Sequence, residues 1–190
     1  DGAIVALALD AEVHIVDSQG AAWRAVESLF LGPGISAVDP TRQLATHVRF
    51  PIPDGRWGTA WSRLGCRPSL VLPILNCAVS LGLDDAGRQI ESARIALGPV
   101  APTPHRARGA ESFLKGRPPE PAALAEAARL VQECADPRDS ITRASRAYRL
   151  AVIPALVEEA LALAVQRALN DPAPLTWPGE SSAVAQSGGA

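Results

Sequence analysis

The feature that most constrains the fold is a long apolar segment in the middle of the chain, residues 70–83, with the sequence LVLPILNCAVSLGL. This run predicts a strand with an irregular entry at Pro73. A strong turn signal follows at residues 84–87, Asp-Asp-Ala-Gly, and the chain returns as a second strand over residues 89–97. Together with a strand predicted over residues 57–65, these segments predict a three-stranded antiparallel sheet.

The residues before this sheet predict a smaller mixed unit. Residues 4–9 are apolar and indicate the end of a helix, and residues 11–16 alternate between apolar and polar side chains as a strand does. A second short strand over residues 21–26 follows a turn, which predicts a hairpin. Residues 44–52 alternate again and end in prolines, so we expect one more strand there. The Pro-Asp-Gly segment at residues 53–55 is the best internal boundary.

The residues after the sheet predict three helices and a tail, which makes the fold class α+β. The helices are expected over residues 105–114, residues 120–133 and a segment that starts near residue 140 and ends at residue 169. Thr103 and Pro104 have the pattern of an N-cap and a first-turn proline, and Asp139 or Ser140 is expected to cap the third helix. Pro154 is expected to interrupt that helix. Residues 171–190 are rich in Pro, Gly and Ser and predict a disordered tail.

Composition excludes several classes of function. The net charge of −2 offers no broad positive field for nucleic acid, and no run of apolar residues is long enough to span a membrane. The three cysteines, Cys66, Cys77 and Cys134, form no metal-binding motif, and they fit a reducing cytoplasm. We find no nucleophile with an adjacent base and no phosphate-binding loop motif. The residues alone therefore indicate a soluble α+β protein without a visible active site.

Four segments, in order, resemble a known family. They are ALALDAEVHIVD (residues 6–17), the loop and strand of residues 29–51, the sheet of residues 58–107 and the helical residues 140–161. Together they resemble the C-terminal portion of the FAD-binding (medium) subunit of molybdenum hydroxylases, the carbon monoxide dehydrogenase and xanthine dehydrogenase family. The third segment is the most specific, because its turns, prolines and small residues fall in register over fifty positions.

The resemblance implies an architecture. Residues 1–53 correspond to the end of a vanillyl-alcohol-oxidase-like FAD-binding domain. Residues 56–170 correspond to the C-terminal domain of the flavoprotein, expected as a three-stranded antiparallel sheet with three helices. Residues 171–190 are left as the tail.

The resemblance also implies a function. Such a subunit takes electrons from the 2Fe-2S clusters of an iron–sulfur subunit onto FAD and passes them to an external acceptor, such as NAD, oxygen or quinone. A molybdopterin-binding large subunit oxidises the substrate. Two alternatives stay open: an interaction module that retains the C-terminal domain but binds no flavin, and an unrelated α+β binding protein.

The resemblance assigns four cofactor-binding positions. Asp1 falls where the family has an acidic residue near the ribityl chain and ring of the flavin, and Val38 falls near an apolar residue that packs on the isoalloxazine. Trp61 replaces a Tyr or Phe close to the flavin, and Ser62 replaces a Lys that some relatives carry. Ser62 cannot supply that positive charge, for which Arg63 is a substitute. The alternative roles are an ordinary N-cap for Asp1, a core contact for Val38 and a buried strand aromatic for Trp61.

One family feature is missing from the sequence. Nothing in residues 1–31 matches the glycine-rich loops that hold the FAD pyrophosphate through their backbone N–H groups. We therefore expect this chain to be the C-terminal portion of a longer flavoprotein, and to bind FAD weakly or not at all by itself. Tight stoichiometric binding of FAD in an absorbance titration would contradict this expectation.

Overall fold

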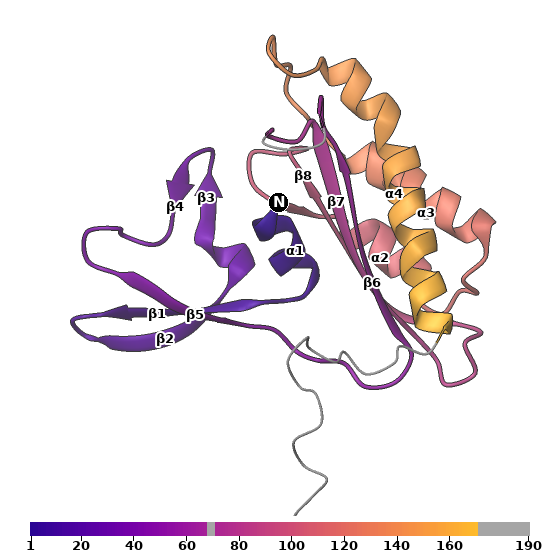
Figure 1. The fold of residues 1–190 in the computed structure, drawn as a ribbon, viewed down its shortest axis with the longest axis horizontal. Helices are drawn as coiled ribbons and strands as arrows, with labels where there is room; N and C mark the ends of the chain where they lie inside the picture. Colours follow the sequence, from indigo (N-terminus) through magenta and orange to yellow (C-terminus); the bar gives the residue numbers. More distant parts are fainter. Residues whose placement is uncertain (68–70, 171–190) are drawn as a thin grey trace, which may run out of the picture.

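The described residues form two main antiparallel sheets, with one short helix between them, and a two-stranded hairpin (Figure 1). This computed structural model describes residues 1–67 and 71–170, so the predicted tail lies outside the described residues. The expected α+β class is confirmed, with the N-terminal sheet and the larger C-terminal sheet in the predicted order along the chain.

The C-terminal sheet has the strand order β6-β7-β8-β9, and every pairing in it is antiparallel. Its strands are β6 (Trp57–Leu64), β7 (Leu75–Leu83), β8 (Ile90–Gly98) and β9 (His105–Arg106). The three long strands are those predicted, and β9 is a short addition at the edge. The helix predicted from residue 105 begins only at Arg108, because His105 and Arg106 pair with β8 instead.

Three helices cover one face of this sheet (Figure 1). They are α2 (Arg108–Leu114), α3 (Pro121–Cys134) and α4 (Arg146–Leu169), and their apolar faces form the main core with β7 and β8. The core includes Val79, Ile95, Leu114, Val131 and Leu161, all almost fully buried.

Helix α4 differs from the prediction at both its start and its middle. Ser145 is its N-cap and its hydroxyl accepts from the N–H of Tyr148, while Asp139 accepts from the N–H of Arg146. The predicted interruption at Pro154 was wrong, because α4 is one element through that position. Its buried residues continue on both sides of the proline, so packing against the sheet outweighs the one backbone hydrogen bond that proline removes.

Residue Gly58 sets the distance between β6 and α4. It is buried on the helix-covered face of the sheet, opposite Ala164 and Ala168. A Cβ at this position would overlap the carbonyl oxygen of Ala164 and lie 2.8 Å from the N of Ala168. The helix can therefore lie directly on the strand only because the strand has no side chain there.

The N-terminal part forms a smaller sheet of order β2-β1-β5 and a separate two-stranded hairpin. Its elements are α1 (Gly2–Ala8), β1 (Glu12–Asp17), β2 (Gly20–Ala25), the 3-10 helix η1 (Val26–Leu29), β3 (Phe30–Gly32), β4 (Ile35–Ser36) and β5 (Leu44–Arg49). Strand β5 lies at an edge of the sheet and all six of its residues are exposed.

Helix α1 joins the two sheets (Figure 1). Ile4, Leu7 and Ala8 are buried against Ala78 of β7 and Ala96 of β8, on the sheet face opposite to α2, α3 and α4. Alanine at both sheet positions leaves room for the helix to lie close to the strands. The N-terminal end of α1 is thereby held against the sheet. The candidate site lies beside this end of the helix.

The described cysteines are all free, and only Cys77 is buried. Burial raises the pKa of the Cys77 thiol to about 12. We expect a colorimetric thiol reagent at about pH 8 to modify Cys66 and Cys134 in the native protein, and Cys77 only after unfolding. In the unfolded chain the pKa of the Cys77 thiol returns to its ordinary value of 9.0. The free energy of unfolding is therefore expected to fall as the pH rises above that value, because only the unfolded chain can then lose the proton. Reaction of all three thiols without denaturant would contradict the buried position.

Candidate functional site

The candidate site lies on the face of the C-terminal sheet that carries α1. Trp61 pairs with Ala78 and Arg63 pairs with Asn76, and paired residues share a face of an antiparallel sheet. Ala78 packs against α1, and Trp61 lies on the same face on the neighbouring strand β6, with 43% of its surface exposed. The structure therefore places Trp61 and Arg63 on the face of the sheet that carries α1.

The Asp1 carboxylate belongs to this site rather than to its helix. Asp1 holds the N-cap position of α1, but its side chain makes no capping hydrogen bond. Its Oδ1 accepts from Nδ2 of Asn76 at 2.5 Å, and its Oδ2 lies 3.5 Å from Nε of Arg63. The ordinary N-cap role therefore does not describe this side chain.

A pocket of about 310 Å³ opens beside Asp1. Its walls are mainly apolar and proline-rich, and its lining includes Asp1, Ile4, Leu72, Asn76, Pro99 and Arg143. Asn76 is only 2% exposed, and its buried side-chain oxygen has no hydrogen-bond partner among the described residues. The pocket thus combines an apolar surface with the Asp1 carboxylate, which suits a ligand that donates hydrogen bonds.

Two of the four assigned residues lie elsewhere. Ser62 follows Trp61 in a strand and so points to the opposite face, where its hydroxyl donates to Oε2 of Glu159 on α4 at 2.7 Å. Val38 packs against the small core of the N-terminal part, and its N–H donates to the hydroxyl of Ser36. The structure brings Asp1 and Trp61 to one face, and it places Ser62 and Val38 apart from them.

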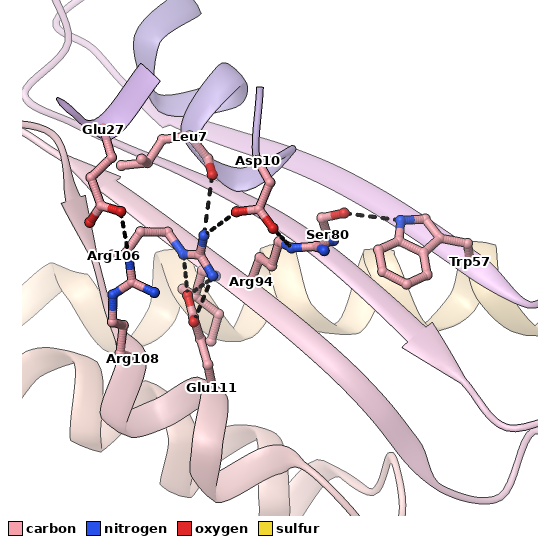
Figure 2. A network of polar contacts seen from close by, with 10 residues as sticks. Leu7, Asp10, Glu27, Trp57, Ser80, Arg94, Arg106, Arg108 and Glu111 are labelled. Atoms are coloured by element: carbon pink, nitrogen blue, oxygen red, sulfur yellow. Dashed lines mark hydrogen bonds and ion pairs between the residues drawn. The ribbon is translucent and has the colours of Figure 1, made fainter. Parts of the chain in front are cut away.

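An ion-pair network beside α1 was not predicted from the sequence (Figure 2). Arg106, whose side chain is 7% exposed, donates to both oxygens of Glu111 and lies 2.6 Å from Oδ1 of Asp10. Its Nη1 also donates to the carbonyl of Leu7 at 3.5 Å, and Arg94 pairs with the second oxygen of Asp10. The network fixes the C-terminal end of α1 to the sheet, as Asn76 and Arg63 fix its N-terminal end.

The charge on Arg106 is stabilised by its partners. Burial acts to lower the pKa of Arg106, but its hydrogen bonds and ion pairs with Glu111 and Asp10 outweigh burial and raise it. Glu111 also accepts from the N–H of Ile95 at 2.9 Å, which ties α2 to β8. Arg106 is therefore a permanent cation that connects α1, α2 and β8.

Within residues 1–67 and 71–170, no three His, Cys, Asp or Glu side chains gather in a group that could hold a metal ion. Among the helices of the same residues, none is both long and apolar enough to cross a membrane.

This sheet, with three helices on one face and a short helix on the other, has an α+β architecture. The family of CO dehydrogenase flavoprotein C-terminal domains matches residues 63–174, more than half of the chain, and the chain belongs to this family. No curated protein sequence matches the chain.

Solved structures of CO dehydrogenases and of a quinoline oxidoreductase have the same fold. The chain is 26% identical to the reconstituted CO dehydrogenase of Oligotropha carboxidovorans, with a TM-score of 0.79 over 88% of this chain and 57% of that one. CO dehydrogenase of Hydrogenophaga pseudoflava gives 26% identity and a TM-score of 0.81, with coverages of 88% and 56%. Quinoline 2-oxidoreductase of Pseudomonas putida 86 is 26% identical to the chain, with a TM-score of 0.78 over 89% of this chain and 57% of that one.

These matches confirm the resemblance to the C-terminal portion of the flavin subunit of molybdenum hydroxylases, and they confirm its α+β fold. The chain spans little more than half the length of the chains it matches.

Proposed function

We propose that this chain is the C-terminal portion of an FAD-containing electron-transfer subunit of a cytoplasmic molybdenum hydroxylase. Its partners would be an iron–sulfur subunit with 2Fe-2S clusters and a molybdopterin-binding large subunit. When bound, FAD would supply the redox chemistry, between the iron–sulfur clusters and an external electron acceptor. Membership of the flavoprotein family supports this proposal. The geometry around Asp1 indicates which residues would contact the flavin.

The residues around the pocket fit a flavin. The ribityl chain of FAD carries hydroxyl donors, and the Asp1 carboxylate is an acceptor at the pocket wall. The guanidinium of Arg63 lies 3.5 Å from that carboxylate and helps to orient it. Trp61 offers a half-exposed aromatic ring on the same face, which suits stacking on or shielding of an isoalloxazine.

The other two assigned residues take a different place in this proposal. In the part of the chain that the structure describes, Ser62 is hydrogen-bonded to Glu159 on the far face of the sheet. A flavin contact by Ser62 therefore requires that bond to open, and it remains a prediction. Val38 remains a predicted contact from the N-terminal part of the protein.

Purification from the native cells tests the proposed function. A tag on this chain is expected to bring down a complex that contains FAD, iron and molybdenum, measured by visible absorption and elemental mass spectrometry. Iron and molybdenum without flavin would identify the chain as an interaction module instead. A tagged chain that carries none of the three would overturn both interpretations.

A substitution tests the Asp1 contact within that complex. We expect Asp1→Asn to weaken FAD binding roughly 10- to 100-fold, because a hydrogen bond to a charged acceptor contributes about 1.5–3 kcal/mol. The measurement is the flavin retained on dialysis, with circular dichroism to confirm folding. Asp54→Asn is the matched control, since Asp54 is exposed in the loop before β6. Equal flavin retention by the two variants would remove Asp1 from the site.

A further inference from the structure

Arg149, in the first turns of α4, is a buried cation without a carboxylate partner among the described residues. It is only 2% exposed, and its one hydrogen bond to those residues runs from Nη1 to the carbonyl of Pro99 at 3.4 Å. Its Nε is buried and has no partner in the same part of the chain. A buried charge without a counter-ion destabilises a fold by several kcal/mol, so the missing partner calls for an explanation.

The charges around Arg149 make its position less favourable. Burial lowers the pKa of Arg149, the nearby Arg143 and Arg138 lower it further, and Asp139 alone acts to raise it. Asp139, however, already accepts from the N–H of Arg146. Among the described residues, no carboxylate pairs with Arg143, Arg138 or Arg149.

The second acid of this region is also occupied. Asp136 pairs with the side chain of Arg146 at 2.5 Å. Two of the first three N–H groups of α4 are capped as well, since Asp139 and Ser145 accept from Arg146 and Tyr148. The unsatisfied positive charge therefore belongs to the arginine side chains and not to open backbone groups.

Part of this charge lies at the wall of the pocket beside Asp1, where Arg143 is a lining residue and Arg149 lies behind Pro99. Pro99 lines the pocket and its carbonyl oxygen accepts from Arg149, and Arg143 lines the pocket directly. Asp1 lies in the same lining, so the pocket has an acidic side and a basic side. A ligand with a donor group and an oxyanion would match both.

We propose that Arg149 and Arg143 form a binding site for an oxyanion, a carboxylate or a phosphate, at the basic side of this pocket. Their guanidinium groups supply planar N–H donors of the kind that bind such groups, and the positive end of the α4 dipole adds to their field. The oxyanion would provide the counter-ion that Arg149 lacks. This site deepens the proposed function and rests on its use of the same pocket, but its test needs no flavin.

Thermal unfolding of the purified chain tests the site, with inorganic phosphate and acetate as probes. Each is compared with chloride at equal ionic strength. At saturating phosphate we expect the midpoint to rise by roughly 3–8 °C. Arg143 is exposed, so the Arg143→Gln variant should fold. We expect this variant to lose most of the rise in midpoint. Arg149→Met should lose all of it, and its midpoint in chloride should equal or exceed that of the parent chain, because an apolar side chain replaces an unpaired buried charge.

Arg42→Gln is the control, because it removes one exposed positive charge from the N-terminal part. It should keep the full shift, and a general stabilisation by phosphate would appear equally in all four proteins. A shift with acetate as well as phosphate identifies a carboxylate site, and a shift with phosphate alone identifies a phosphate site. No shift beyond chloride, or an undiminished shift in both Arg143→Gln and Arg149→Met, would overturn the proposal.

Discussion

Arg106→Met is expected to lower the free energy of unfolding by about 3–5 kcal/mol, the range for removal of one partner from a buried ion pair. The Glu111 side chain is only 10% exposed and would keep its charge without its main partner. Asp10 would keep its contact with Arg94, so the loss falls mainly on Glu111. Urea unfolding followed by circular dichroism measures the change.

A neighbouring ion pair supplies the control for this prediction. Arg108 pairs with Glu27 at 2.5 Å, but the two side chains are 61% and 48% exposed. Arg108→Met should therefore cost no more than about 1 kcal/mol. The double variant Arg106→Met/Glu111→Leu should recover part of the loss, because no unpaired carboxylate stays buried. If Arg106→Met and Arg108→Met lower the free energy of unfolding by similar amounts, the buried network stabilises the protein no more than an exposed ion pair does.

Gly58→Ala is expected to destabilise the protein by more than about 3 kcal/mol, at or above the upper end of the usual effect of overpacking. The new methyl group would occupy the space of the Ala164 carbonyl oxygen, which belongs to the backbone of α4 and cannot rotate away. The helix would have to move off the strand as a whole. We expect a lower thermal midpoint and a weaker near-ultraviolet signal from the tryptophans of β6.

Gly109→Ala is the matched control, because the same replacement is expected to raise the stability of the protein instead of lowering it. Gly109 lies in α2, and a Cβ there meets nothing within 4 Å. Alanine should stabilise that helix by about 0.5–1 kcal/mol. The two variants thus separate contact with α4 from the general effect of replacing glycine. A Gly58→Ala protein as stable as its parent would show that β6 and α4 are farther apart than described.

Local patterns in the sequence were sufficient to predict the long strands and most helices. The apolar run and the turn at Asp84 predict β7 and β8, because each signal lies within a few residues of what it determines. Strand β9 has only two residues, and its pairing depends on where the chain returns to β8. Pro154 misled the prediction, because the packing of α4 on the sheet is a tertiary effect.

The candidate site was predictable only in part. Asp1 and Trp61 came from the family resemblance, and the structure places both on one face of the sheet. The polar Asn76 inside an apolar run was a signal that sequence analysis did not use. Arg106 and Asp10 are 96 positions apart, so no local pattern could join them. Ser62 shows a further limit, because neighbouring strand residues point to opposite faces.

Strand β5 determines how the chain behaves at high concentration. All six of its residues are exposed, with Leu44 and Val48 more than 60% exposed, and its outer edge has no partner strand within the residues that the structure describes. An open edge with apolar side chains is a template for intermolecular β-pairing. Self-association of this chain would therefore begin at β5 while the well-packed C-terminal sheet remained folded, and a charged residue at Val48 would be the simplest way to suppress it.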